Sequence, residues 1–258
     1  MKVQNLILAL LTAGLFTCCA KDSGNPISKT YDLADFTALD VSHAFEVEVL
    51  PSDVESVEVV ISSGIEKYLR VEKKGATLRI GMKKGYTGWF RVNPCMKAYV
   101  SCKALTSVEA SGASDVELKA AYDAMGQNME IDLSGASSFK GQILNVNRLT
   151  ADLSGASSIK GKVLNANRLE VELSGASEME MDGNGSELDL DASGASKADL
   201  ADFPVKNFVG ELSGASKGIL YVTETFKVKA SGASEVEVKG NPTVVKIDES
   251  GSSTVEFK

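Results

Sequence analysis

The sequence predicts an all-β protein, built as a right-handed parallel β-helix of about 20-residue coils with an N-terminal β-rich module. Three observations support this fold class. A serine-rich tetrapeptide recurs at intervals of 18 to 23 residues, apolar residues alternate with polar ones on both sides of it, and helical periodicity is weak throughout. The tetrapeptide S-G-A-S begins at Ser111, Ser134, Ser154, Ser174, Ser193, Ser213 and Ser231, and a variant begins at Ser250.

The first 29 residues have the pattern of an exported, lipid-modified protein. Lys2 precedes an apolar run that is too short for a lasting membrane span, and the run ends at Thr17-Cys18-Cys19. A small residue and a cysteine after such a run are typical of bacterial lipoproteins. We therefore expect a signal peptide over residues 1–17, acylation of Cys18, with Cys19 as the alternative, and a tether over residues 18–29. An ordinary signal peptide or an uncleaved segment is the competing interpretation.

Residues 30–105 contain strand patterns but no tetrapeptide, and we treat them as an N-terminal β-rich module continuous with the solenoid. Alternation predicts strands over residues 45–49, 57–61 and 77–80, and the best helical candidate is a turn over residues 64–68. Export would place Cys95 and Cys102 in an oxidising compartment, where they can form a disulfide if a turn lies between them. Two buried thiols are the alternative.

Residues 106–258 form the repeats. In Leu149-x-Ala151-x-Leu153 a strand runs into the tetrapeptide, and a second strand leaves it. A 20-residue unit cannot bury its own apolar face, so equivalent strands of successive units are expected to pair in parallel, with right-handed connections. The tetrapeptide is then a corner, in which glycine supplies backbone freedom. A β-propeller is less suitable because a blade usually takes 40 residues or more.

Several of these segments together resemble a known family of bacterial exported proteins. They are Phe36-x-x-Leu39-x-Val41, Val47-x-Val49-x-Pro51, Thr77-Leu78-x-Ile80, and Leu105-x-x-Val108 leading into Ser111-Gly112-Ala113-Ser114. The chain is similar, over about residues 33–258, to the putative auto-transporter adhesin, head GIN domain family. The resemblance implies a β-helical fold, lipid anchoring to the outer membrane at the cell surface of a Gram-negative bacterium, and an adhesive role without enzymatic activity.

Composition excludes several function classes. The formal net charge is −8 and no basic cluster is present, which is the wrong sign for nucleic-acid binding. A serine hydrolase is disfavoured because the chain has one histidine, His43, and lacks the G-x-S-x-G elbow. We expect neither a zinc site nor a cofactor. Two competing functions stay open, a polysaccharide-active β-helix enzyme and a structural envelope protein, and the uniform coils favour a non-enzymatic glycan-binding or protein-binding surface.

Two surfaces are the candidate contact sites. A carboxylate stands two residues before most tetrapeptides and points outward, so stacking predicts a ladder that attracts cations or a basic partner. A solvated face is the alternative. The ladder residues are Glu109, Asp132, Asp152, Glu172, Asp191 and Glu211, and the recurring Lys140, Lys160, Arg148 and Arg168 are expected to flank them.

The second candidate is a glycine-flanked aromatic segment that occurs once, with Tyr86, Trp89 and Phe90 as ligand contacts. A hydrophobic plug between the module and the solenoid is the alternative. The last coil, around Val255-Glu256-Phe257, is expected to expose a pairing edge, which would allow end-to-end self-association.

Overall fold

The N-terminal third of the chain folds into short strands. The structure is a computed structural model, and it describes residues 24–87 and 94–258. The strands of this part are β1 (Pro26–Tyr31), β2 (Ala38–Val41), β3 (Glu46–Pro51), β4 (Ser56–Ser62), β5 (Leu69–Lys74), β6 (Thr77–Met82) and β7 (Met96–Cys102), with a 3₁₀ turn at Glu66–Tyr68. The expected strands over 45–49, 57–61 and 77–80 and the expected turn over 64–68 are thereby confirmed to within a few residues.

In the repeats two strands flank each tetrapeptide. The strands of this part are β8 (Ser107–Ala110), β9 (Asp115–Leu118), β10 (Tyr122–Asp123), β11 (Asn128–Leu133), β12 (Ser138–Leu144), β13 (Arg148–Leu153), β14 (Ser158–Leu173), β15 (Glu178–Ala192), β16 (Lys197–Leu212), β17 (Lys217–Ala230), β18 (Glu235–Lys239), β19 (Thr243–Glu249) and β20 (Thr254–Phe257). Of these, β14 to β17 are longer than any strand of the N-terminal part.

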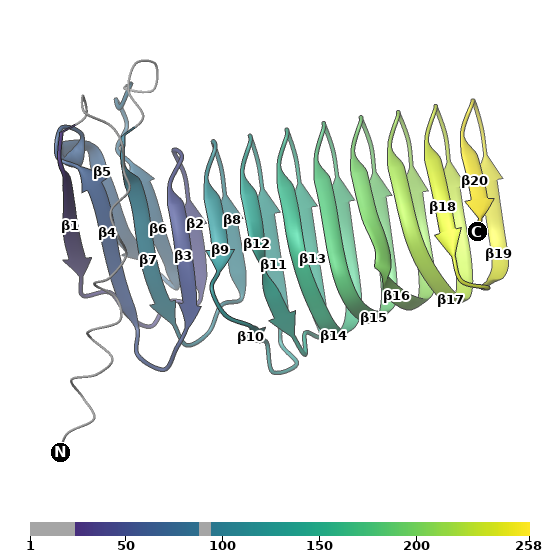
Figure 1. The fold of residues 1–258 in the computed structure, drawn as a ribbon, viewed down its shortest axis with the longest axis horizontal. Helices are drawn as coiled ribbons and strands as arrows, with labels where there is room; N and C mark the ends of the chain where they lie inside the picture. Colours follow the sequence, from purple (N-terminus) through teal and green to yellow (C-terminus); the bar gives the residue numbers. More distant parts are fainter. Residues whose placement is uncertain (1–23, 88–93) are drawn as a thin grey trace.

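Two walls of hydrogen-bonded strands run along the rod and enclose one core (Figure 1). The strands that enter the tetrapeptides form wall A, in the order β5, β6, β2, β8, β11, β13, then the second halves of β14 to β17, and β19. The strands that leave them form wall B, in the order β1, β4, β7, β3, β9, β12, then the first halves of β14 to β17, β18 and β20. The expected parallel β-solenoid of roughly 20-residue coils is confirmed.

The N-terminal end of the rod differs from the rest in that it contains antiparallel strand pairs. Within residues 24–87 and 94–258, β1 and β4, β4 and β7, and β5 and β6 pair antiparallel, whereas the other paired strands are parallel. The alternating sequence pattern does not distinguish the two directions, because both present side chains with a period of two residues.

Register places equivalent residues of successive coils directly above one another. Leu133 pairs with Leu153, and Leu153 with Leu173. Each of the three is at most 2% exposed. Such columns bury the alternate residues of both walls, and this mutual cover is what a single 20-residue unit lacks. In the part of the chain that the structure describes, no helix is long and apolar enough to cross a membrane.

Candidate functional site

The tetrapeptides form the upper edge of the rod in Figure 1, and their serines are structural. The fourth serine of each S-G-A-S is buried. In one coil Ser157 Oγ donates to the carbonyl of Ser154 at 2.9 Å and lies 3.2 Å from that of Leu133 in the preceding coil. The hydroxyl thus satisfies the Ser154 carbonyl of the corner, whereas the Leu133 carbonyl also accepts from the backbone N–H of Ser154 at 2.9 Å. The interpretation of the tetrapeptide as a corner is confirmed.

Glycine at the second corner position is required by both conformation and space. Gly155 has a φ of +77°, and a Cβ there would lie 2.5 Å from the carbonyl oxygen of Gly135. The first coil replaces this glycine with His43 at a φ of 70°, in the corner Ser42-His43-Ala44-Phe45. Strands β2 and β3 pair with β8 and β9 on either side of it, which makes it the equivalent of the corner at Ser111. The His43 imidazole lies 2.8 Å from Ser42 Oγ, and burial lowers its pKa.

The acidic ladder forms on wall A as one row in register. Successive pairings align Glu109 with Asp132, then Asp152, Glu172, Asp191 and Glu211, and all six are exposed. Asp40 extends the row at its N-terminal end, where it pairs with Arg79 at 3.2 Å, and Lys229 closes the other end with an ion pair to Glu211 at 3.0 Å.

Among the described residues, no member of this row from Glu109 to Asp191 forms an ion pair with a lysine or an arginine. Burial and neighbouring carboxylates raise the pKa of Glu109 and of Asp132. No group of three or more His, Cys, Asp or Glu residues in the described chain has a geometry that could hold a metal ion. The ladder therefore concentrates negative charge, and cation binding by it stays a prediction.

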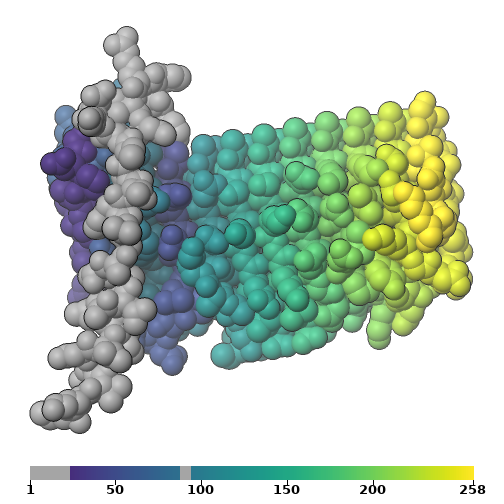
Figure 2. All heavy atoms as spheres, in the orientation of Figure 1, coloured from purple at the N-terminus to yellow at the C-terminus, as the bar shows by residue number. Residues whose placement is uncertain are grey.

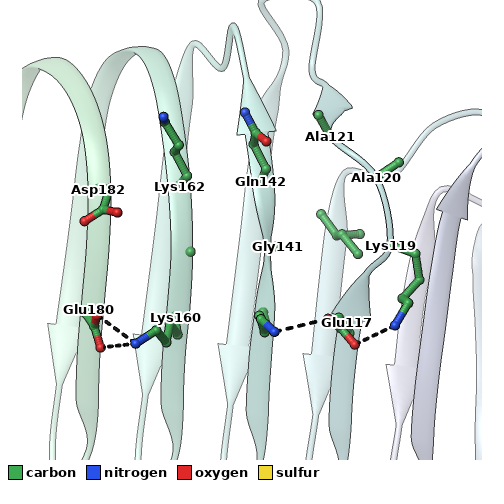
Figure 3. Close-up of a pocket in the computed structure, with 13 residues that line it drawn as sticks. Glu117, Lys119, Ala120, Ala121, Gly141, Gln142, Lys160, Lys162, Glu180 and Asp182 are labelled. Atoms are coloured by element: carbon green, nitrogen blue, oxygen red, sulfur yellow. Dashed lines mark hydrogen bonds and ion pairs between the residues drawn. The ribbon is translucent and has the colours of Figure 1, made fainter.

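Lys140 and Lys160 do not flank that row. They lie on wall B, in β12 and β14, where they line a groove of about 360 Å³ (Figure 3). One column along the groove consists of Glu117, Lys140, Lys160 and Glu180. Lys140 pairs with Glu117 at 3.3 Å, and Lys160 with Glu180 at 2.7 Å.

A second column along the same groove consists of Gln142, Lys162 and Asp182, aligned by strand register (Figure 3). Within the described residues, none of these three side chains forms a hydrogen bond or an ion pair with another side chain. An amide, an ammonium and a carboxylate therefore lie on successive strands, about 4.8 Å apart. Their donors and acceptors remain available to a ligand.

Two glycines lie between the columns. A Cβ on Gly161 would lie 2.4 Å from the carbonyl oxygen of Gly141, and a Cβ on Gly141 would lie 2.8 Å from the Leu118 side chain. The absent side chains expose backbone between the two columns. The described residues that line this groove include no aromatic side chain, so recognition by them depends on hydrogen bonds and charge. The groove was not predicted from the sequence, although the Lys-Gly pairs at residues 140–141 and 160–161 were a signal for it.

The aromatic segment lies between β6 and β7 in the sequence, and of its candidate contacts the structure describes Tyr86. The two strands pair on opposite walls with the strands that flank the corner at His43. Tyr86 is partly buried, and its ring packs 5.6 Å from that of Tyr68. Burial raises the pKa of Tyr86. Trp89 and Phe90 lie outside the described residues, so their role as ligand contacts stays a prediction.

The cysteine predictions have different outcomes. The Cys95–Cys102 bridge does not form, since Cys102 is a free, buried cysteine. Strand β7 runs without a turn from Met96 to Cys102, and an extended stretch of that length spans about 23 Å, well beyond disulfide reach. Burial raises the pKa of the Cys102 thiol to about 11. Cys18 and Cys19 lie outside the described residues.

Comparison with known proteins gives one family and several solved structures. The model of the family described as putative auto-transporter adhesin, head GIN domain, matches residues 35–242. A putative lipid binding protein from Parabacteroides distasonis is 19% identical, with a TM-score of 0.80 over 91% of this chain and 97% of its own. Putative adhesins from Parabacteroides merdae and P. distasonis are 17% and 20% identical, with TM-scores of 0.81 and 0.82, each over 91% of this chain and 98% of its own. No curated protein matches.

Proposed function

Because the chain belongs to the putative auto-transporter adhesin, head GIN domain family, we propose that it is a non-enzymatic binding protein of the cell surface. In this proposal the lipid on Cys18, or on Cys19, anchors the chain to the outer membrane. The solenoid is then a rigid support that holds the groove on wall B away from the anchor. The ligand is a glycan, or the polar surface of another protein.

The column of Gln142, Lys162 and Asp182 is the observation that carries this proposal. Three chemically different polar groups stand in a row on hydrogen-bonded strands, so binding a ligand would require little reordering of the backbone. Hydroxyl groups of a sugar can accept from the amide and the ammonium and donate to the carboxylate. The charged lining favours such a polar ligand over a lipid tail.

The charge state of the groove supports binding rather than glycoside cleavage. A catalytic acid in such an enzyme needs a raised pKa, so that it holds a proton near neutral pH. Hydrogen bonding to Lys119 instead lowers the pKa of Glu117. Glu180 forms an ion pair with Lys160, so both carboxylates of the first column are engaged by lysines.

A glycan array probed with residues 24–258 tests the proposal. Lys162→Ala and Asp182→Ala are each expected to weaken binding to any hit about tenfold or more, because a hydrogen bond to a charged group contributes about 1.5–3 kcal/mol. Lys227→Ala on wall A is the matched control, since Lys227 is also an exposed lysine outside the groove.

A reducing-sugar assay on each hit separates the competing functions. Binding without product supports the proposal, whereas release of product would identify an enzyme. Absence of binding to glycans and to surface proteins would favour a structural role in the envelope. Equal affinities for the wild type and the two groove variants would place the ligand elsewhere on the rod.

A further inference from the structure

The C-terminal coil lies at one end of the rod (Figure 2), and within the described chain its two strands each have an unpaired edge. Among the described strands, β19 pairs only with β17, and β20 pairs only with β18. Val244 is 47% exposed and Phe257 is 44% exposed, whereas their equivalents one coil earlier, Phe226 and Val238, are 0% exposed. Core positions and backbone hydrogen-bonding groups are thus both left open at this end.

The N-terminal end is closed by a different arrangement. Antiparallel β1 and β4 extend wall B there, and antiparallel β5 ends wall A. Pro26 in β1 has no N–H to donate, and β5 carries exposed Glu72, Lys73 and Lys74. Proline and charged side chains are common means of blocking an edge strand. Head-to-tail stacking of copies into a filament is therefore disfavoured, because among the described strands β1 and β5 end the rod with these blocking residues.

The charges on this edge are self-complementary. In an antiparallel pair of identical strands centred on one residue, the residue before the centre lies opposite the residue after it in the partner. β19 contains Lys246-Ile247-Asp248, so pairing centred on Ile247 places each lysine opposite an aspartate. The end of the chain contains Glu256-Phe257-Lys258, so pairing centred on Phe257 places each glutamate opposite a lysine.

Inner strands of wall A that are equivalent to β19 do not have self-complementary charges. Pairing of β11, β15 or β17 with a copy of itself in this way would bring like charges together. The flanking residues are Glu130 and Asp132 in β11, Asp189 and Asp191 in β15, and Lys227 and Lys229 in β17. Glu249 is the one charge of β19 at an inward register position, opposite Ala230, and it lies exposed at the strand end, outside the charge-matched stretch.

We propose that the C-terminal coil is a homodimer interface, in which β19 and β20 of two copies pair antiparallel across a twofold axis. The dimer buries the exposed faces of Val244, Ile247, Val255 and Phe257 and completes the open hydrogen bonds. Assembly stops at two copies, because the N-terminal ends, with their blocked edges, lie at the two far ends of the joined rods. If the lipid anchor proposed above is present, the dimer would join rods from two surfaces.

Cysteine crosslinking of the full chain in intact cells tests the geometry. Ile247→Cys places a thiol at the twofold axis, where it meets the same thiol of the partner, so we expect a disulfide-linked dimer on non-reducing electrophoresis. Asp152→Cys introduces an exposed thiol in the middle of wall A and is the control, with the natural cysteines identical in both. Equal crosslinking of the two variants would overturn the proposal.

Charge reversal provides a second, independent test. Lys246→Asp and Asp248→Lys each place like charges across the interface, so each full chain that also carries Ile247→Cys is expected to lose at least tenfold in crosslinking when tested alone. Mixing the two variants, carrying different affinity tags, restores opposite charges and should recover a mixed dimer that co-purifies. Both residues are exposed, and circular dichroism confirms that each variant folds. Failure of the mixture to dimerise, with both variants folded, would refute the arrangement.

Discussion

Replacement of Asp132 by Asn should stabilise the protein. Asp132 lies between Glu109 and Asp152 in the row on wall A, and it has no ion pair among the described residues. Burial and the Asp152 and Glu130 charges raise its pKa, which means that the folded state disfavours the carboxylate. Asparagine keeps nearly the same shape and removes the charge.

The size of the effect follows from the strand spacing. Two unit charges about 4.8 Å apart repel by about 0.9 kcal/mol in water, so two neighbours contribute at most about 1.7 kcal/mol. Exposed side chains can rotate apart and are screened, so we expect a gain of about 0.5–1 kcal/mol at low salt. At 1 M salt the Debye length is about 3 Å, and the gain should fall below about 0.4 kcal/mol.

The pH dependence has a defined sign. Since the folded-state pKa of Asp132 is raised, the folded state binds more protons, and wild-type stability falls as the pH rises from the unfolded-state value of about 3.9 through the folded-state value. The advantage of the Asn variant is therefore present at pH 7 and disappears below that window. Denaturant unfolding at both pH values and both salt concentrations measures it.

Asp53→Asn is the control, because Asp53 is exposed and lies outside the row. We expect no change in its free energy of unfolding. A destabilised Asp132→Asn variant would contradict repulsion along the row and would point to a counter-ion bound there. A gain that is independent of salt would also contradict repulsion as its cause.

Two further predictions concern a corner and an ion pair. Gly155→Ala should lower the free energy of unfolding by more than about 2 kcal/mol, because left-handed backbone costs an alanine about 1–2 kcal/mol and its Cβ would also lie 2.5 Å from the Gly135 carbonyl oxygen. Gly126 has a similar φ and open space around it, so Gly126→Ala should lose only the backbone contribution. Equal losses for the two variants in urea unfolding would refute this account. Hydrogen bonding to Lys217 lowers the pKa of Glu237 to about 2, so the free energy of unfolding of the wild type should fall as the pH drops from 4.5 towards 2. The free energy of unfolding of Glu237→Gln should fall less over the same pH range. Identical pH dependence of the two proteins would exclude a contribution of the Glu237–Lys217 pair.

The sequence was sufficient to predict the solenoid and the acidic row, because equal spacing fixes the register. Once Ser154 and Ser174 are recognised as equivalent, Asp152 and Glu172 must lie one coil apart, as they do. The corner at His43 was missed because its glycine and its fourth serine are both replaced. Val41-Ser42-x-Ala44 nevertheless keeps the spacing of the repeats.

The groove could not be predicted in the same way. Gln142, Lys162 and Asp182 are different residue types 20 positions apart, so they do not stand out as a repeat. They form a site only because the strands align them and because glycines between the columns remove side-chain volume. The outcome at Cys102 likewise depended on whether β7 turns, which its alternating pattern does not specify.

The alignment of corners also makes the length of the rod adjustable by whole units. Leu153 and Leu173 occupy equivalent backbone positions, so removal of residues 154–173 would join Leu153 to Ser174 with the same geometry that the corner now has. Each such tandem deletion or duplication changes the reach of the molecule by about 4.8 Å and leaves both ends intact. Unequal recombination within the repeated stretch is thus a route by which this architecture can vary its distance from an anchoring surface.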